Sequence, residues 1–353
     1  MLKTNSRLAL VGGLIVLILA GCNGTPLGGL SDSTILVPER MRTPDWPGAE
    51  IDSVAVWRGD EDRNWIFVTG KTSNLVYVCD AVSGETLQTI GSGEIDDATL
   101  RRPNGILVVD DLLYVVERDN QRVQVFSLPE LKSVGTFGKD RLIYPYGIAA
   151  RSLPSHHEVF ITDNFDAFDD QGNPVSLDGR IKKFRVTASE GIVHATHELS
   201  FGAEAGTDQL IEVESILADP TSDRLYVCDE PGNVVRVYDS SGKDLKETIG
   251  EGTIRYEPEG MVFIENTELN PEGVLVITDQ GEDQTILRIF SPDGKEYLGS
   301  FTGDPVLANT DGICFIPESF GPFVKGALFC VHDDLRVQGY SWGDVEKGLT
   351  AKE

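Results

Sequence analysis

The chain has 353 residues and a formal net charge of −27, with 57 acidic against 30 basic side chains. Such an acidic surface repels nucleic acid and anionic membrane headgroups, which excludes both as partners, whereas it is compatible with divalent cations. The five cysteines show no CxxC spacing. Free thiols are expected at four of them, with one disulfide left open: Cys79, Cys228, Cys314 and Cys330.

The first residues are typical of a secretion signal. Lys3 and Arg7 flank the start of an apolar run over residues 8–19, which is short for a membrane span. The run ends in Leu-Ala-Gly-Cys, which resembles the bacterial lipobox, where the cysteine is acylated. We therefore expect a signal peptide over 1–21, a lipid anchor on Cys22 and a flexible tether over 22–36; an uncleaved anchor helix is the alternative. The domain would then lie at the cell envelope, on the outer membrane or another extracytoplasmic face.

The chain from residue 37 to 345 repeats one pattern of short apolar runs. A first run occurs six times, at 52–57, 104–109, 146–150, 214–219, 259–264 and 311–316. A second follows each, at 65–71, 113–119, 159–164, 225–230, 274–280 and 328–334. Five pairs of alternating strands complete the pattern, at 75–91, 122–138, 180–202, 234–250 and 286–303, and the sixth unit ends with a degenerate strand at 336–342.

Four short strands per unit, repeated six times, predict an all-β six-bladed β-propeller with four-stranded antiparallel blades. A β-sandwich does not predict a four-strand period, and no stretch carries a sustained helical period. Residues 34–46 are expected to complete a neighbouring blade and close the ring, and residues 346–353 to form a C-terminal tail.

Polar residues open the first run of every unit. Since these strands line a propeller's central channel, their opening residues converge on one ring: Asp52, Asn104, Tyr146, Glu214, Glu259 and Asp311. The alternative is that strand starts are polar because they face solvent, but chance rarely chooses four acids out of six. Converging carboxylates repel unless they are neutralised, and hard oxygen ligands in such number suit calcium. Zinc is disfavoured because the five histidines lack ligand spacing.

A second set of charged residues follows the second runs, and plain turn formation is an equal alternative for each acid. It comprises Lys71, Glu117, Arg118, Asp163, Asn164, Asp229, Glu230, Asp279, Gln280, Asp333 and Asp334. The chain has no Gly-x-Ser-x-Gly elbow and no phosphate-binding GxxxxGK[ST] motif. Catalysis would therefore depend on metal ions and carboxylates.

Several segments together resemble the β-propeller phytases. They are DSVAVW (52–57), VTGKTSN (68–74), VESILADPTSDRLYVCDE (213–230), YEPEGMVFI (256–264) and NTDGICFIPESFGPFVKGALFCVHDD (309–334). The resemblance spans nearly the whole chain after the signal and is strongest over 211–342. It implies a propeller that binds several calcium ions at one channel end, where basic side chains bind phytate and a metal-activated water attacks a phosphate.

The resemblance also implies roles for individual residues. Asp52, Glu214, Glu259, Asp311 and Glu230 would hold calcium, with Glu230 and Asp311 also serving catalysis. Lys71, Arg118 and Tyr146 would bind phosphate. Two positions depart from the family: Thr72 follows Lys71 in place of a second lysine, and Asp163-Asn164 replaces Lys-Glu. Calcium would then supply more of the charge neutralisation.

The resulting expectation is a monomeric, calcium-dependent phosphomonoesterase that acts on phytate or a similar phosphorylated small molecule. Residues 102–128 and 224–243 also resemble NHL repeats, which build six-bladed propellers that mostly bind partners. A non-catalytic propeller that binds a protein or glycan is therefore the alternative. The discriminating feature is the ring of four acids, which a binding scaffold does not need.

Overall fold

Short β-strands build almost all of the chain in the computed structural model, which describes residues 34–60, 63–93, 98–168, 171–172, 175–202 and 209–351. These residues belong to one compact unit, Ser33–Glu353. The all-β class predicted from the alternating apolar runs is confirmed. The expected signal peptide, the lipidated Cys22 and most of the tether lie outside the described residues.

Four separate sheets each contain four antiparallel strands that follow one another in the chain. The first holds β2 (Ile51–Arg58), β3 (Asn64–Gly70), β4 (Leu75–Asp80) and β5 (Thr86–Ile90). The second holds β6 (Pro103–Val109), β7 (Leu112–Glu117), β8 (Arg122–Ser127) and β9 (Ser133–Phe137). The third holds β10 (Pro145–Leu153), β11 (His156–Asp163), β12 (Ile181–Ser189) and β13 (Ile192–Phe201). The fourth holds β14 (Ile216–Ala218), β15 (Arg224–Asp229), β16 (Val234–Asp239) and β17 (Asp244–Ile249), with a 3₁₀ turn, η1 (Glu230–Gly232), after β15.

The remaining strands form one eight-stranded sheet made of two antiparallel halves. One half is β18 (Glu257–Ile264), β19 (Val274–Gln280), β20 (Ile286–Phe290) and β21 (Tyr297–Asp304). The other is β22 (Ile313–Ile316), β23 (Ala327–His332), β24 (Arg336–Ser341) and the N-terminal β1 (Thr34–Arg42). β1 is antiparallel to β24 and parallel to β21, so it completes the last four-stranded unit and joins it to the preceding one. The expected closure by residues 34–46 is confirmed.

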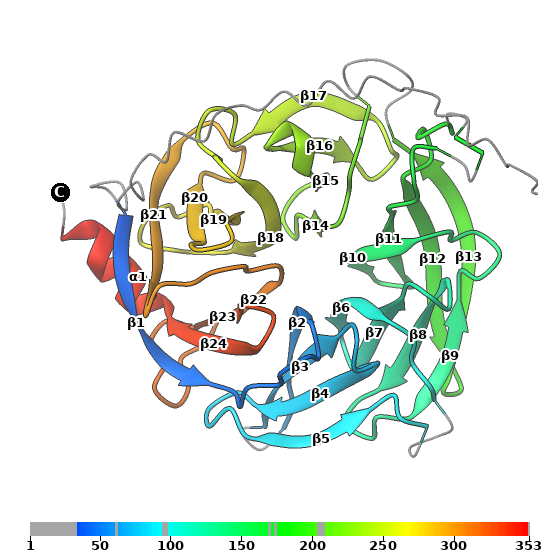
Figure 1. Ribbon diagram of the computed structural model, residues 1–353, viewed down its shortest axis with the longest axis horizontal. Coiled ribbons are helices and arrows are strands. Elements are labelled where there is room, and N and C mark those ends of the chain that lie inside the picture. The colour runs from blue at the N-terminus through cyan, green and yellow to red at the C-terminus, as the bar shows by residue number, and fades with distance from the viewer. Residues whose placement is uncertain are drawn as a thin grey trace, which may run out of the picture. The chain divides into compact units, whose positions relative to one another are not determined.

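The sheets surround a common centre, toward which each presents its first strand (Figure 1). The first strands β2, β6, β10, β14, β18 and β22 contact one another in a closed cycle. The described apolar core is divided into six clusters, each packed between neighbouring four-stranded units. This arrangement is consistent with the blades of a β-propeller, since each blade buries its faces against its neighbours rather than in one central core.

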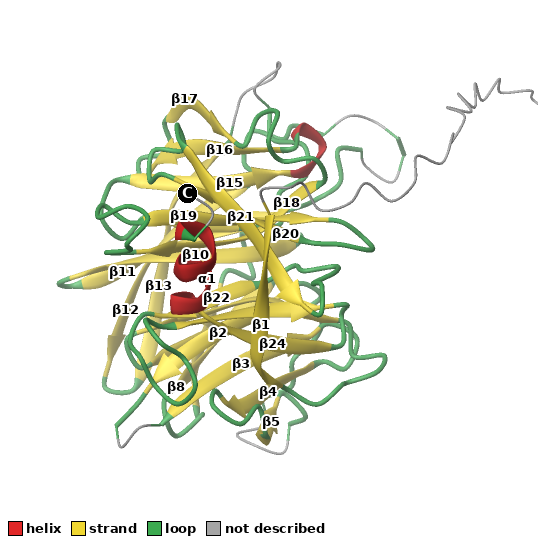
Figure 2. Ribbon diagram, turned by 90° about the vertical axis from the view of Figure 1, so that its left-hand side faces the viewer, coloured by secondary structure: helices red, strands yellow, loops and turns green. Residues whose placement is uncertain are grey.

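Both ends of the expected domain differ from the sequence prediction. The strand β1 begins at Thr34, within the expected tether. The helix α1 (Trp342–Thr350) occupies most of the expected C-terminal tail and packs beside β1 (Figure 2). Its nine residues are too few for a helical period to be recognised, but Trp342 and Val345 are buried in the core.

The four cysteines of the described chain, Cys79, Cys228, Cys314 and Cys330, are free thiols, so the disulfide left open by the sequence is not formed among them. In the same part of the chain, no helix combines the length and the apolar character that crossing a membrane requires.

Candidate metal centre

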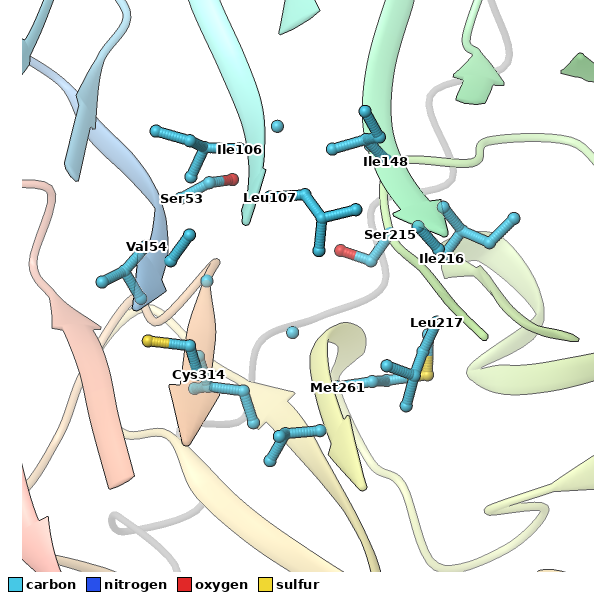
Figure 3. A pocket seen from close by; sticks show the side chains of 18 of the residues that line it. Ser53, Val54, Ile106, Leu107, Ile148, Ser215, Ile216, Leu217, Met261 and Cys314 are labelled. Carbon is cyan, nitrogen blue, oxygen red and sulfur yellow. The ribbon is translucent and has the colours of Figure 1, made fainter. Parts of the chain in front are cut away.

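The residues that open the first strands meet at a single cavity of about 290 Å³. Five of the six predicted ring residues line it: Asp52, Tyr146, Glu214, Glu259 and Asp311. Apolar side chains from all six first strands form the rest of the wall, and Figure 3 shows them gathered around one space. The cavity is therefore polar where the strands begin and apolar along their length.

The sixth ring residue, Asn104, is fully buried and does not line this cavity. Its side-chain nitrogen and oxygen both lack a hydrogen-bond partner within the described structure. A buried amide without partners is costly, so a ligand or water that satisfies it would stabilise the fold.

Irregular strand pairing directs the ring side chains. In four of the units, the pairing of the first and second strands shifts at the ring position: between Ile51 and Val54, Pro103 and Ile106, Pro145 and Ile148, and Pro258 and Met261. A β-bulge inserts an extra residue and re-aims a side chain, which is why bulges are frequent at functional sites. The same local irregularity thus presents Asp52, Tyr146 and Glu259 to the centre.

Small residues after the ring positions allow the first strands to approach closely. A Cβ atom on Gly147 would lie 2.1 Å from the backbone oxygen of Glu214, and one on Gly312 would lie 2.7 Å from the Cα of Ser53. The Gly312 N–H also donates to the Asp52 carbonyl over 3.0 Å, which links the last unit to the first. Contact between neighbouring backbones at these points brings the ring residues together.

Three glutamates form a close group of carboxylates at the centre. Glu214, Glu230 and Glu259 each place one carboxylate oxygen within 4.8 Å of the other two. Burial, together with the neighbouring carboxylates, raises the pKa of Glu214 to about 7 and that of Glu230 to about 9. Burial raises the pKa of Glu259 well above its ordinary value. The group therefore resists carrying three negative charges unless a cation joins it.

Asp52 forms an ion pair with Lys71 instead of joining the three glutamates. Its Oδ1 lies 2.7 Å from Lys71 Nζ and accepts a hydrogen bond from the Tyr146 hydroxyl over 3.1 Å. Lys71 also donates to the Tyr146 oxygen over 2.8 Å. Although burial by itself lowers the pKa of Lys71, the carboxylates of Asp52 and Asp311 outweigh it and keep the lysine protonated. These contacts form a closed triangle at the edge of the cavity.

Asp311 lies outside the group of three glutamates. Burial, then the charge of Asp52, raises its pKa well above the ordinary value, while Lys71 and a hydrogen bond from Gln280 act in the opposite direction. The structure therefore brings the five predicted calcium ligands to one site but divides them: Glu214, Glu230 and Glu259 form one group, Asp52 pairs with Lys71, and Asp311 faces Lys71 and Gln280.

The group of three glutamates fits a calcium ion. Oxygen is its donor atom throughout, and calcium takes six to eight oxygen ligands in flexible geometry. The Oε1 atom of Glu230 is buried without a hydrogen-bond partner in the described structure, as expected of an oxygen that coordinates a cation. No described histidine or cysteine belongs to the group, which disfavours zinc.

The acids that end the second strands have a structural role. Glu117, Asp163, Asp229 and Asp279 are buried, and each accepts backbone N–H bonds from the loop that leads into its own sheet's first strand. Each also pairs with a basic side chain of the third strand: Arg122, Lys182, Arg236 and Arg288, respectively. These acids therefore hold the loops that place the ring residues, and the turn-forming interpretation applies to them.

Arg118 lies beside the centre rather than in it. Its guanidinium stacks over the Tyr144 ring at 4.4 Å and forms an ion pair with Asp119 at 2.8 Å. It lines a neighbouring cavity of about 470 Å³, which also contains Tyr146 and Glu214. Arg102 and Arg180 line this cavity too, and neither was predicted from the sequence because neither occupies a repeated position at a strand end.

No family model matches the chain. No curated protein matches it either.

Proposed function

We propose that the chain is a calcium-dependent phosphomonoester hydrolase built on a six-bladed β-propeller of the phytase type. It would act at the cell envelope on phytate or another phosphate ester. The observation that supports this most is the group of three glutamates, with an unpartnered Glu230 oxygen, close to the cation of Lys71. Metal-assisted phosphate hydrolysis requires carboxylates that bind the metal ion and positive charge that attracts the anionic phosphate.

Glu214, Glu230 and Glu259 would hold the first calcium ion, and Asp52 and Asp311 provide further oxygens at the same cavity. When bound, calcium would neutralise the carboxylates, polarise phosphate oxygens and lower the pKa of a water. The side chains along the strands that line the cavity are largely apolar, and electrostatic interactions are stronger in less polar surroundings.

The protein's own groups would orient the ester. Lys71 has three N–H donors, and two of them are used by Asp52 and Tyr146. Because the Lys71 side chain remains 17% exposed, its third N–H can reach a phosphate oxygen. Arg118 borders the same region. Hydrolysis forms a bond between the water oxygen and phosphorus and breaks the bond between phosphorus and the alcohol oxygen. Glu230 or Asp311 would accept the proton that the water loses, and this proton would then pass to the leaving alcohol oxygen.

The proposal is tested by phosphate release from the purified full-length chain. We expect release from phytate or phenyl phosphate in calcium and none in chelator. Glu259→Gln should abolish calcium-dependent release, because a neutral amide weakens the ion's site, while Glu190→Gln should not. Glu190 is an exposed glutamate in the turn between β12 and β13, which makes it a matched control. No release from any phosphate ester at any calcium concentration would refute the proposal.

A calcium-stabilised propeller that binds a protein or glycan without catalysis is the second candidate. One observation favours it: Lys71 and Arg118, the two proposed phosphate ligands, are already paired with Asp52 and Asp119. It predicts that calcium raises the melting temperature while no ester is hydrolysed. Lys71→Met would then alter stability alone.

A further inference from the structure

The cavity beside the glutamates is lined by three aromatic side chains among charged and polar ones. It measures about 470 Å³ and shares Tyr146 and Glu214 with the metal centre, so a ligand could occupy both at once. Its size suits part of a small organic molecule rather than a peptide.

Two arginine–aromatic pairs line this cavity. The guanidinium of Arg118 lies 4.4 Å from the Tyr144 ring, and that of Arg180 lies 4.9 Å from the Phe165 ring. Tyr144 remains 39% exposed although it lies in the loop that leads to the centre. Guanidinium planes and aromatic rings both stack on flat ligand groups.

The charges in the cavity balance. Its three arginines are offset by Asp166 and Glu212 in the lining and by Glu50 and Asp119, which pair with Arg102 and Arg118.

Each of these arginines also forms hydrogen bonds or an ion pair within the protein. Arg180 donates to Asn164 Oδ1 over 3.0 Å and to the Ile211 carbonyl over 2.6 Å, and Arg118 and Arg102 form ion pairs with Asp119 and Glu50. A ligand with many phosphates would therefore find few free cations outside the metal centre.

We infer that this cavity binds the leaving group of a phosphate monoester that carries one phosphate and an aromatic group. The inference rests on the proposed function, since the phosphate of the ester would occupy the metal centre. It also separates the preferred substrate from phytate, whose remaining phosphates would face a cavity without net positive charge. Tyr144 is the residue that would contact the aromatic ring and set the preference.

Binding can be measured apart from turnover with phosphonates, whose carbon–phosphorus bond is not hydrolysed. Calorimetric titration of the full chain in calcium should show phenylphosphonate binding about three- to tenfold more tightly than methylphosphonate, the range that one stacked ring provides. Tyr144→Ala should reduce phenylphosphonate affinity to that of methylphosphonate. Tyr297→Ala is the matched control, because Tyr297 in β21 is equally exposed at 39% and lies outside this cavity; it should leave both affinities unchanged.

The outcomes distinguish this inference from the proposed function. A phenyl preference that Tyr144→Ala removes supports the site, even if no ester is hydrolysed and the proposed hydrolase activity fails. Equal affinity for the two phosphonates, or a preference that survives Tyr144→Ala, overturns the inference. Hydrolysis of phytate with a higher kcat/KM than phenyl phosphate overturns it as well, while leaving the proposed function intact.

Discussion

Removal of calcium should make the stability of this protein fall steeply as the pH rises. The unfolded carboxyl of Glu214 ionises near its ordinary value of 4.5, whereas in the folded protein burial raises its pKa to about 7. Between these values the folded state binds more protons than the unfolded state, so the free energy of unfolding decreases with rising pH. Glu230, whose folded pKa is about 9, extends the decrease to higher pH.

The size of the effect follows from the shift. A rise of the Glu214 pKa from 4.5 to about 7 corresponds to about 3 kcal/mol at about 1.4 kcal/mol per pKa unit. Most of this energy is lost between about pH 5 and about pH 8, so at about 2–4 °C of Tm for each kcal/mol in domains of this order of size, Glu214 alone should lower the Tm of the calcium-free protein by roughly 5–10 °C over that range. Calcium at about a hundred times its Kd should restore about 2.7 kcal/mol of that stability.

Thermal unfolding of the full chain across this pH range, in calcium and in chelator, measures both the pH-dependent loss of stability and the stabilisation by calcium. Glu230→Gln removes one charge of the three, so it should flatten the pH dependence in chelator and reduce the rise in Tm that calcium causes. Glu190→Gln should reproduce the wild-type curves. A calcium-free protein whose Tm does not fall between about pH 5 and about pH 8, or a Glu230→Gln variant with the wild-type slope, would refute the electrostatic argument.

Three further predictions concern the groups around the centre. Lys71→Met should lower the free energy of unfolding, measured by urea titration, by about 3–5 kcal/mol, because Asp52 would be left buried without its cation. A loss of less than about 1 kcal/mol would contradict the pairing of Lys71 with Asp52. Gly147→Ala should lower the free energy of unfolding by about 1–3 kcal/mol, because the added Cβ would clash with the Glu214 carbonyl, and calorimetry should show weaker calcium binding. Gly179→Ala is the control and should change neither quantity, because its added Cβ would lie within 3.4 Å only of the end of a lysine side chain. Asp279→Ala should destabilise the fold in thermal melts by several kcal/mol, because Arg288 loses its buried partner. Calcium should still bind and raise the Tm of this variant, because Asp279 holds the loop before Glu259 and is not itself a ligand; a total loss of calcium binding would place Asp279 in the site instead.

The repeat pattern was sufficient to predict the strands of the repeat and five of the six ring residues. Each unit alternates apolar and polar positions with the same spacing, and a strand has only two faces, so equivalent positions in successive units must point the same way. Asp52, Tyr146, Glu214, Glu259 and Asp311 were therefore identifiable from the repeat alone, and they line one cavity. The closing strand β1 was predictable for a similar reason, because the last unit lacks a fourth strand of its own.

Pairing between units was not predictable from the sequence. Lys71 contacts Tyr146 of another unit as well as Asp52 of its own, and Glu214 and Glu230 group with Glu259 of the next unit. The cavity beside Arg118 also joins residues from different units. The acids that end the second strands illustrate the same limit, since a strand-end acid has the same sequence pattern whether it binds a ligand or holds a loop. The repeat determines which face a residue occupies, whereas the distances between charges depend on how closely neighbouring sheets pack, and only the tertiary structure decides that.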